Sequence, residues 1–204
     1  MTAMSVRGVI FDLDGTLIDS GLDFDQMRRD MQFAPGQFIL ETLALLPEGE
    51  RKEQCRAILR AHEHRGALSA TLMPGAHDLV AELGRRGIPL AILTRNSREM
   101  TELALRRLEL SFDQVLTRED AAPKPDPAGL LQICRIWKAD VTEVLFVGDF
   151  QFDLWAGRRA GITTVLYAPA GPPDYAHEAD FVVAHLSEIC SVVTNLDRRI
   201  NERR

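Results

Sequence analysis

The sequence contains few cysteines, and their spacing pairs none of them. Cys55, Cys134 and Cys190 lie far apart, are odd in number and form no C-x-x-C motif. This distribution argues against a disulfide framework and against a zinc site, because both need cysteines at defined spacings. It favours reduced thiols, as in the cytosol.

The sequence also lacks long apolar runs and basic stripes. No apolar stretch approaches the roughly 20 residues of a membrane-spanning helix, and Asp12 cuts the first apolar run short before it could serve as a signal peptide. The formal net charge is −6, without the clustered Lys and Arg of proteins that bind nucleic acid or anionic membranes. We therefore predict a cytoplasmic protein, a monomer or weak dimer, that acts on a small soluble substrate.

Enough apolar residues are present to bury a core. The chain has 204 residues and is 46% hydrophobic, which fits one domain with at most a modest insertion. Strands are predicted at 8–11, 88–93, 115–116, 144–147, 163–167 and 181–183. Helices are expected over 74–86, from Asn96 with Glu99 three positions on, from Asp126-Pro127, and over 189–204. Because parallel strands need helical crossovers that cover the sheet, this alternation predicts a doubly wound α/β fold with a parallel sheet.

The interval 19–73 interrupts this alternation. Helical patterns occur near 25–31, 37–46 and 51–67, without a convincing strand between them. We predict a small α-helical cap at 19–73, inserted after the first strand, and a core domain made of 1–18 and 74–204. Short hinges near 18–20 and 71–74 should join the two, because no flexible Gly/Ser linker is present.

The first candidate site follows the first strand, at Asp12-Leu13-Asp14-Gly15-Thr16. Alternation in an extended chain places Asp12 and Asp14 on the same side, and Gly15 allows a turn that brings its amide near a bound anion. Two such carboxylates can divide roles, one ionised as a nucleophile and the other carrying a proton for a leaving group. A solvated acidic turn would have the same sequence.

Two further segments could bind phosphate oxygens. Thr94 ends a predicted strand and precedes Arg95 and Asn96, so its hydroxyl and the free amides of the following helix are suitable donors. Thr94 and Asn96 could equally serve only as helix caps. Lys124 lies between two prolines that fix its backbone, so its ammonium could neutralise a carboxylate and a phosphate together. A lone lysine is more often solvated surface.

A fourth segment, 148–153, places Asp149 and Asp153 at the start of a helix, directly after a buried strand. Both side chains could be helix caps, but Mg²⁺ prefers hard oxygen ligands of this kind. All four segments fall at the carboxyl edge of the predicted sheet, where open α/β sheets bind ligands. Four crowded carboxylates would repel one another unless a divalent cation and Lys124 supplied the compensating charge. The pattern therefore predicts a Mg²⁺ site.

Together these motifs resemble those of the haloacid dehalogenase superfamily. The sequence contains, in the order of that family, D-x-D-G-T at 12–16, Thr94 at a strand end, Lys124 in K-P-D-P and G-D-x-x-x-D at 148–153. The insertion between the first two motifs is similar to that of phosphoglycolate-phosphatase-like members with small helical caps. The resemblance implies a phosphomonoester hydrolase that uses Mg²⁺ and an aspartyl-phosphate intermediate, with the cap covering the active site.

The resemblance also implies a role for each residue. Asp12 would attack phosphorus, and Asp14 would protonate the leaving group and later activate water. The phosphate-binding residues would be Gly15, Thr94, Arg95, Asn96 and Lys124. The metal would be held by Asp12, by Asp14 through its backbone carbonyl, and by Asp149, with Asp153 orienting the metal's waters. Phe150 departs from the pattern, because many relatives carry a small hydroxyl residue there.

The reaction class follows from Asp14, since dehalogenases and phosphonatases lack an aspartate at that position. A phosphomutase would share it, and a non-catalytic phospho-ligand-binding protein would share the fold. Because every residue that the chemistry needs is present, we expect a phosphatase that acts on a small phosphorylated metabolite. Arg28-Arg29 and the His62–Arg65 run could meet an anionic substrate, but charges on helices mostly face solvent. Arg95, beside Thr94, is the better candidate for a second anionic group.

Overall fold

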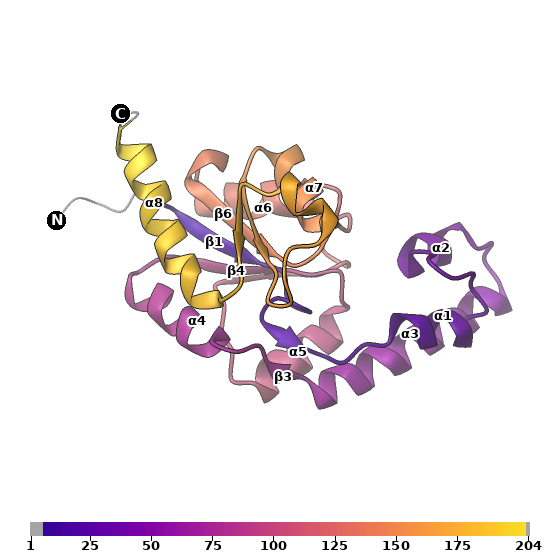
Figure 1. Ribbon diagram of the computed structural model, residues 1–204. Helices are drawn as coiled ribbons and strands as arrows, with labels where there is room; N and C mark the ends of the chain where they lie inside the picture. Colours follow the sequence, from indigo (N-terminus) through magenta and orange to yellow (C-terminus); the bar gives the residue numbers. More distant parts are fainter. Residues whose placement is uncertain (1–5, 203–204) are drawn as a thin grey trace. The chain divides into compact units, whose positions relative to one another are not determined.

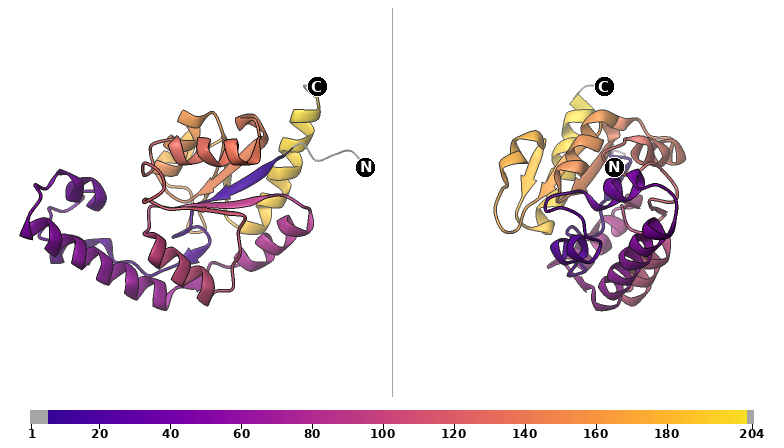
Figure 2. Two further views of the ribbon diagram at one scale, coloured as in Figure 1. Left: turned by 180° about the vertical axis from the view of Figure 1, so that it is seen from behind. Right: turned by 90° about the vertical axis from the view of Figure 1, so that its right-hand side faces the viewer.

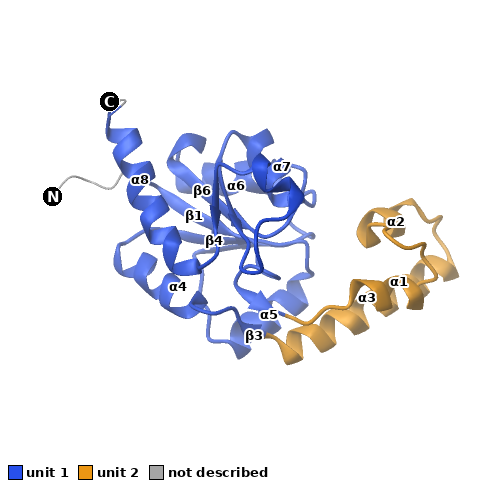
Figure 3. Ribbon diagram, in the orientation of Figure 1, with its two compact units in different colours: residues 1–19, 71–204 blue, residues 20–70 orange. Residues whose placement is uncertain are grey.

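The computed structural model describes residues 6–202 of the chain. They form two compact units, one made of the residues up to Asp19 and from Thr71 onward, and the other of Ser20–Ala70. Figure 3 colours the two units. No helix within 6–202 has both the length and the apolar character needed to cross a membrane. The three thiols are free: Cys55 and Cys134 are buried and Cys190 is partly exposed.

The larger unit is built on a six-stranded sheet. Its strands are β1 (Gly8–Phe11), β4 (Leu90–Leu93), β5 (Gln114–Leu116), β6 (Val144–Gly148), β7 (Thr163–Tyr167) and β8 (Phe181–Val183). They are ordered β5-β4-β1-β6-β7-β8, and every neighbouring pair is parallel. The predicted doubly wound α/β fold is confirmed. The predicted strand 88–93 starts later, at Leu90, because Pro89 has no N–H to donate to the sheet.

Helices cover both faces of this sheet. They are α4 (Ala76–Arg85), α5 (Arg98–Arg107), α6 (Ala128–Trp137), α7 (Gln151–Ala160) and α8 (Ile189–Glu202), with short 3₁₀ turns η1 (Val141–Glu143), η2 (Asp174–Glu178) and η3 (Leu186–Glu188). Helices α6 and α7 lie on one face, and α4, α5 and α8 on the other (Figures 1 and 2). The final predicted helix ends at Glu202 within the described residues, and its last positions, 203–204, lie outside them.

The central strands are apolar throughout because both of their faces are covered. Val9, Ile10 and Phe11 of β1 are fully buried. Ile10 packs with Phe146 of β6 and Leu130 of α6 in one core cluster. Each such side chain stabilises the fold by about 1.5–3 kcal/mol relative to an exposed one. The sheet is therefore a rigid frame that fixes the residues following its strand ends.

A second, two-stranded sheet was not predicted. Strands β2 (Ile18–Asp19) and β3 (Thr71–Leu72) are antiparallel, with Ile18 opposite Leu72 and Asp19 opposite Thr71. Two-residue strands are too short to show alternation in the sequence. This pair lies in the larger unit, where the chain leaves it after Asp19 and returns at Thr71.

The smaller unit is entirely helical in its regular structure. It contains α1 (Phe24–Asp30), α2 (Ile39–Leu45) and α3 (Glu50–Ser69), so helices occur at all three predicted places. Its apolar cluster includes Met27, Met31, Leu43 and Cys55. His62, which the sequence left as a possible substrate contact, instead lies 2.7 Å from the Asp30 carboxylate inside this unit. The function of the unit as a cap stays a prediction.

Candidate active site

The predicted site residues follow three adjacent strands of the sheet. Asp12 comes directly after β1, Thr94 after β4 and Asp149 after β6. Since β1 lies between β4 and β6, the three residues meet at the centre of the carboxyl edge. Lys124 reaches the same place from the connection between β5 and α6, and Asp153 from the first turn of α7. This edge is where open parallel sheets bind ligands.

Lys124 joins two of the acids. Its Nζ lies 2.5 Å from Asp12 Oδ1 and 2.7 Å from Asp153 Oδ1. All three residues are buried, and the Lys124 side chain is only 3% exposed. A buried charge is costly unless it is paired, so these contacts hold the ammonium in one position between the two carboxylates.

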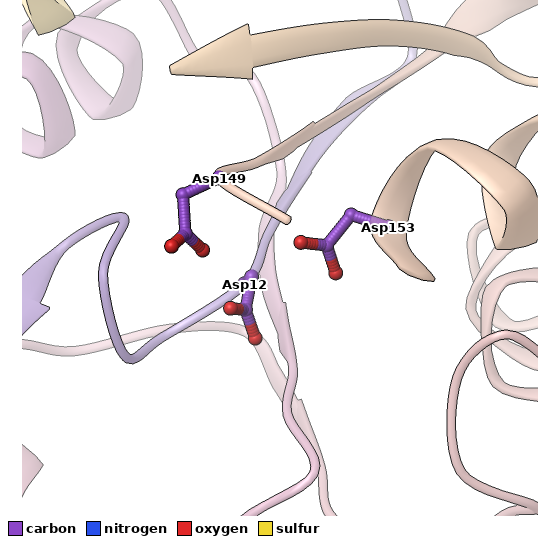
Figure 4. Close-up of side chains that lie close together, drawn as sticks. All are labelled: Asp12, Asp149 and Asp153. Carbon is purple, nitrogen blue, oxygen red and sulfur yellow. The ribbon is translucent and has the colours of Figure 1, made fainter. Parts of the chain in front are cut away.

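Three carboxylates form a cluster with the geometry of a cation site. Oxygen atoms of Asp12, Asp149 and Asp153 lie within 4.8 Å of one another, and Figure 4 shows the three side chains converging from separate elements. With Lys124, these side chains carry three negative charges and one positive charge, so a divalent cation would balance them. Carboxylate oxygens are also the donors that Mg²⁺ prefers. The residues present therefore fit Mg²⁺, and the Asp14 carboxylate is not part of this cluster.

The same crowding changes the acidity of the cluster. Burial raises the pKa of Asp12 well above its usual range, Lys124 opposes this, and the carboxylates of Asp153 and Asp149 add to it. Burial and then the Asp153 charge raise the pKa of Asp149 to about 7. Burial lowers the pKa of Lys124, but Asp12 and Asp153 outweigh it and raise that pKa above the ordinary value. A bound cation would favour the ionised carboxylates.

Two glycines allow the chain to approach the acids closely. A Cβ on Gly15 would stand 2.2 Å from Asp149 Oδ2, and one on Gly148 would stand 2.4 Å from the Asp153 side chain. The Gly15 amide donates a 2.8 Å hydrogen bond to the Ile18 carbonyl, and its predicted role in phosphate binding stays a prediction. Gly15 therefore serves the site through its lack of a side chain.

Asn96 contacts the predicted acid Asp14. Its Nδ2 donates to Asp14 Oδ2 over 3.3 Å, and its Oδ1 accepts from the Ser97 amide. The prediction that Asn96 caps α5 is wrong, since the N-cap is Ser97, whose hydroxyl accepts from the Met100 amide. The physical reason is that α5 begins one residue later than predicted, so Asn96 precedes the N-cap and its side-chain amide can orient Asp14. Its predicted contact with phosphate stays a prediction.

Thr94 is buried at the end of β4. Its amide donates to the Leu116 carbonyl over 3.0 Å, and its Oγ1 accepts from the Asn96 amide, also over 3.0 Å. The hydroxyl thus organises the loop that carries Asn96. It still has a proton to donate, which suits the predicted contact with a phosphate oxygen.

Arg95 makes different contacts from those expected of a ligand for a second anionic group. Its Nη1 donates to the Lys124 carbonyl over 2.8 Å. Its guanidinium carbon lies 4.7 Å from the centre of the Phe152 ring. These contacts connect Arg95 to the Lys124 backbone and to α7. Its predicted contact with a second anionic group of the substrate stays a prediction.

The sequence did not predict the two residues that orient Asp149. Thr16 Oγ1 donates to Asp149 Oδ1 over 3.3 Å, and the Tyr175 hydroxyl donates to the Asp149 carbonyl over 3.1 Å. Thr16 ends the D-x-D-G-T motif, which was a usable signal, whereas Tyr175 is 26 residues from Asp149 and carried none. Phe150 is 39% exposed and lies edge to face with Phe152 and Tyr175.

Comparisons with known proteins show which family this chain is similar to. The family model for haloacid dehalogenase-like hydrolases matches residues 34–167. A haloacid dehalogenase-like hydrolase domain-containing protein of Arabidopsis thaliana is 32% identical, over 94% of this chain and 86% of that protein. The N-acetylmuramic acid 6-phosphate phosphatase of Pseudomonas putida is 28% identical, over 93% and 97% of the two chains.

The solved structures agree on the fold. A predicted phosphoglycolate phosphatase from Haemophilus somnus superposes with a TM-score of 0.74 at 18% identity, covering 93% of this chain and 99% of that one. The family model and the A. thaliana relative together define the class of protein, a hydrolase with an α/β fold. The chain belongs to the haloacid dehalogenase-like hydrolase family.

Proposed function

We propose that this protein is a Mg²⁺-dependent phosphatase that hydrolyses a small phosphomonoester through an aspartyl-phosphate on Asp12. The observation that carries the proposal is that Asp12 pairs with Lys124 and also belongs to one cluster with the carboxylates of Asp149 and Asp153. Phosphoryl transfer depends mainly on positioning and on neutralising the charge of the phosphoryl oxygens. The similarity to a sugar phosphate phosphatase of P. putida supports the same activity.

In the first step an Asp12 carboxylate oxygen attacks phosphorus and the phosphorus–oxygen bond to the leaving group breaks. Asp14 gives its proton to the departing alkoxide, so an alcohol leaves. In the second step Asp14 takes a proton from water, the water oxygen attacks phosphorus, and the bond to Asp12 breaks to release inorganic phosphate. Lys124 and Thr94 donate hydrogen bonds to the phosphoryl oxygens in both steps.

Mg²⁺, held by Asp12, Asp149 and the Asp14 carbonyl, would supply charge neutralisation for the phosphoryl group. Asn96 holds the Asp14 carboxylate toward the site through its amide. Thr16 and Tyr175 hold Asp149 from its side chain and from its backbone. The substrate is proposed to be a phosphorylated metabolite of small size, and the protein to be a cytoplasmic monomer or weak dimer.

The test is a hydrolysis assay over a panel of phosphorylated sugars, nucleotides and hydroxy acids, with Asp12→Asn as the blank. Asp12→Asn is nearly isosteric, so it should fold normally and lose turnover because the attacking oxygen is gone. Wild-type enzyme that is quenched with acid during turnover of a substrate with a labelled phosphate should carry the label. Hydroxylamine should remove this label, as expected of an acyl phosphate. Hydrolysis by clean Asp12→Asn protein at the wild-type rate would exclude the covalent route.

The metal is tested in the same assay. Hydrolysis should vanish with EDTA, return with Mg²⁺, and be inhibited by Ca²⁺, whose larger and looser coordination would misplace Asp12. Full activity in the presence of EDTA would contradict the assignment of Asp149 as a metal ligand. A direct measurement of Mg²⁺ binding tests the same assignment: the wild type should bind Mg²⁺ and Asp149→Asn should not.

A further inference from the structure

The backbone around Lys124 is held by two arginines from different parts of the larger unit. Arg95 Nη1, from the loop after β4, donates to the Lys124 carbonyl over 2.8 Å. Arg159 Nη1, from the last turn of α7, donates to the Pro125 carbonyl over 2.8 Å. Two consecutive carbonyls in the connection between β5 and α6 therefore each accept a charge-assisted hydrogen bond, which is stronger than one between neutral groups.

Arg95 also contacts the element that carries Asp153. Its guanidinium carbon lies 4.7 Å from the centre of the Phe152 ring. Phe152 is 6% exposed and directly precedes Asp153, which pairs with the Lys124 ammonium. Arg95 thus contacts the Lys124 segment by a hydrogen bond and the first turn of α7 by a cation–π contact.

The position of the Lys124 ammonium depends on this framework. A lysine side chain is long and flexible, and fixing it in one position costs rotamer entropy. The ammonium can lie 2.5 Å from Asp12 and 2.7 Å from Asp153 only while the Lys124 backbone and the start of α7 keep their separation. Arg159 links α7 to the Pro125 carbonyl. Arg95 contacts both the Lys124 carbonyl and the Phe152 ring at the start of α7.

We propose that Arg95 is a positioning residue that sets where the Lys124 ammonium stands relative to Asp12. This rests on the proposed function only in that Lys124 is taken to contact the phosphoryl group. Lysine cannot replace Arg95, because the planar guanidinium can donate in its plane while its face lies on a ring, whereas an ammonium has no planar group that does both at once. The proposal is an alternative to the expectation that Arg95 binds a second anionic group of the substrate, and the experiment distinguishes the two.

The experiment compares Arg95→Lys and Arg95→Gln with Arg106→Gln, a control on the exposed side of α5. Two substrates are used, phenyl phosphate, which has no second anionic group, and a phosphorylated hydroxy acid, which has a carboxylate. Both Arg95 variants should lose kcat about 10- to 100-fold on both substrates, because misplacement by about 1 Å costs up to about 100-fold in rate. KM should change far less, and Arg106→Gln should match the wild type.

Two measurements do not need turnover. Orthovanadate, which occupies the phosphoryl position alone, should bind both Arg95 variants at least 10-fold more weakly by calorimetry. Hydrogen exchange of the backbone over 120–128 should be faster in both variants than in the Arg106→Gln control. If the wild type hydrolysed no substrate in the panel, the proposed function would be overturned. Vanadate binding and hydrogen exchange would still decide whether Arg95 is a positioning residue.

Other outcomes would overturn the proposal. If Arg95→Gln raised KM for the carboxylate-bearing substrate alone, with phenyl phosphate and vanadate unaffected, Arg95 would be a substrate contact. If Arg95→Lys restored wild-type kcat, charge and not the fork-shaped guanidinium would be what matters. If Arg95→Gln failed to fold, Arg95→Lys with wild-type exchange over 120–128 would show that the Lys124 segment does not depend on Arg95.

Discussion

Gly15 and Asp149 lie so close together that no side chain fits between them. A Cβ added to Gly15 would stand 2.2 Å from Asp149 Oδ2 and 2.6 Å from its carboxyl carbon. Gly15 also has a φ of +86°, a conformation that glycine adopts without steric cost. The loop after β1 therefore closes against the end of β6, and the two segments together position Asp149.

This contact predicts the effect of Gly15→Ala. The methyl group must displace the Asp149 carboxylate, so Mg²⁺ binding should weaken by at least 10-fold and hydrolysis should be nearly lost. Gly87→Ala is a matched control, because Gly87 has a φ of +70° and nothing within 4 Å of the added Cβ. Both variants should lose about 1–2 kcal/mol of stability from the positive φ, measured by urea unfolding. Equal Mg²⁺ affinity in the two variants would contradict the contact.

Asn96 and Ser97 should separate catalysis from helix stability. Asn96→Ala removes the donor to Asp14 Oδ2, so kcat should fall about 10-fold or more with little change in the free energy of unfolding. Ser97→Ala removes the N-cap of α5 and should cost about 1 kcal/mol of stability with kcat nearly unchanged. Stopped assays and urea unfolding on both variants check this. If instead Asn96→Ala lost stability and Ser97→Ala lost kcat, Asn96 would be the N-cap of α5.

The acidic cluster predicts an unusual pH dependence of stability in metal-free protein. Because the pKa of Asp149 is raised to about 7 in the fold, its stabilising contribution is complete below the unfolded value of about 4 and is lost as pH rises toward 7. The unfolding free energy in EDTA should therefore fall across this window by up to a few kcal/mol. Saturating Mg²⁺ should reduce the fall.

The control is Asp149→Asn, which lacks the titrating group. In EDTA its stability between pH 4 and 7 should decline less than that of the wild type, with both measured by urea unfolding. The same decline in wild type and Asp149→Asn would mean that another group is responsible. The remaining carboxylates are common to both proteins, so the difference between the two curves is the measured quantity.

The sequence predicted the fold well because buried parallel strands are apolar on both faces. The runs 144–147 and 163–167 stand out against amphipathic helices, and each agrees with an observed strand within one residue. The pair β2 and β3 was missed because its two-residue strands are defined by partners 52 and 54 positions apart. Nothing local in Ile18–Asp19 signals that pairing.

For the site, the sequence identified which residues follow the strands but not how they contact one another. Asp12, Lys124 and Asp149 could be named because strand ends and prolines mark them. The contacts of Arg95 with Lys124 and of Tyr175 with Asp149 join segments 29 and 26 residues apart, so they depend on packing. The roles of arginine and tyrosine here are set by their neighbours, which single-sequence periodicity does not reveal.

The last prediction concerns the smaller unit, which we expect to select the substrate. Asp19 and Thr71 are paired across β2 and β3, so the chain can be rejoined there without reaching across a gap. Replacing 20–70 with Asn-Gly should close a two-residue hairpin between them, because this dipeptide favours the turn that matches antiparallel strands. The larger unit keeps its own sheet and core, so this shortened protein should fold cooperatively.

The shortened protein should still hydrolyse phenyl phosphate, because Asp12, Asp14, Lys124 and Asp149 all lie outside the deletion. Its preference among natural phosphate esters should collapse, since a lid that excludes bulk water and confines the leaving group would be gone. The measurement is kcat/KM across the substrate panel, with Asp12→Asn in the shortened protein as the blank. If the folded, shortened protein kept the wild-type order of preference, selectivity would reside in the larger unit and the lid function would be wrong.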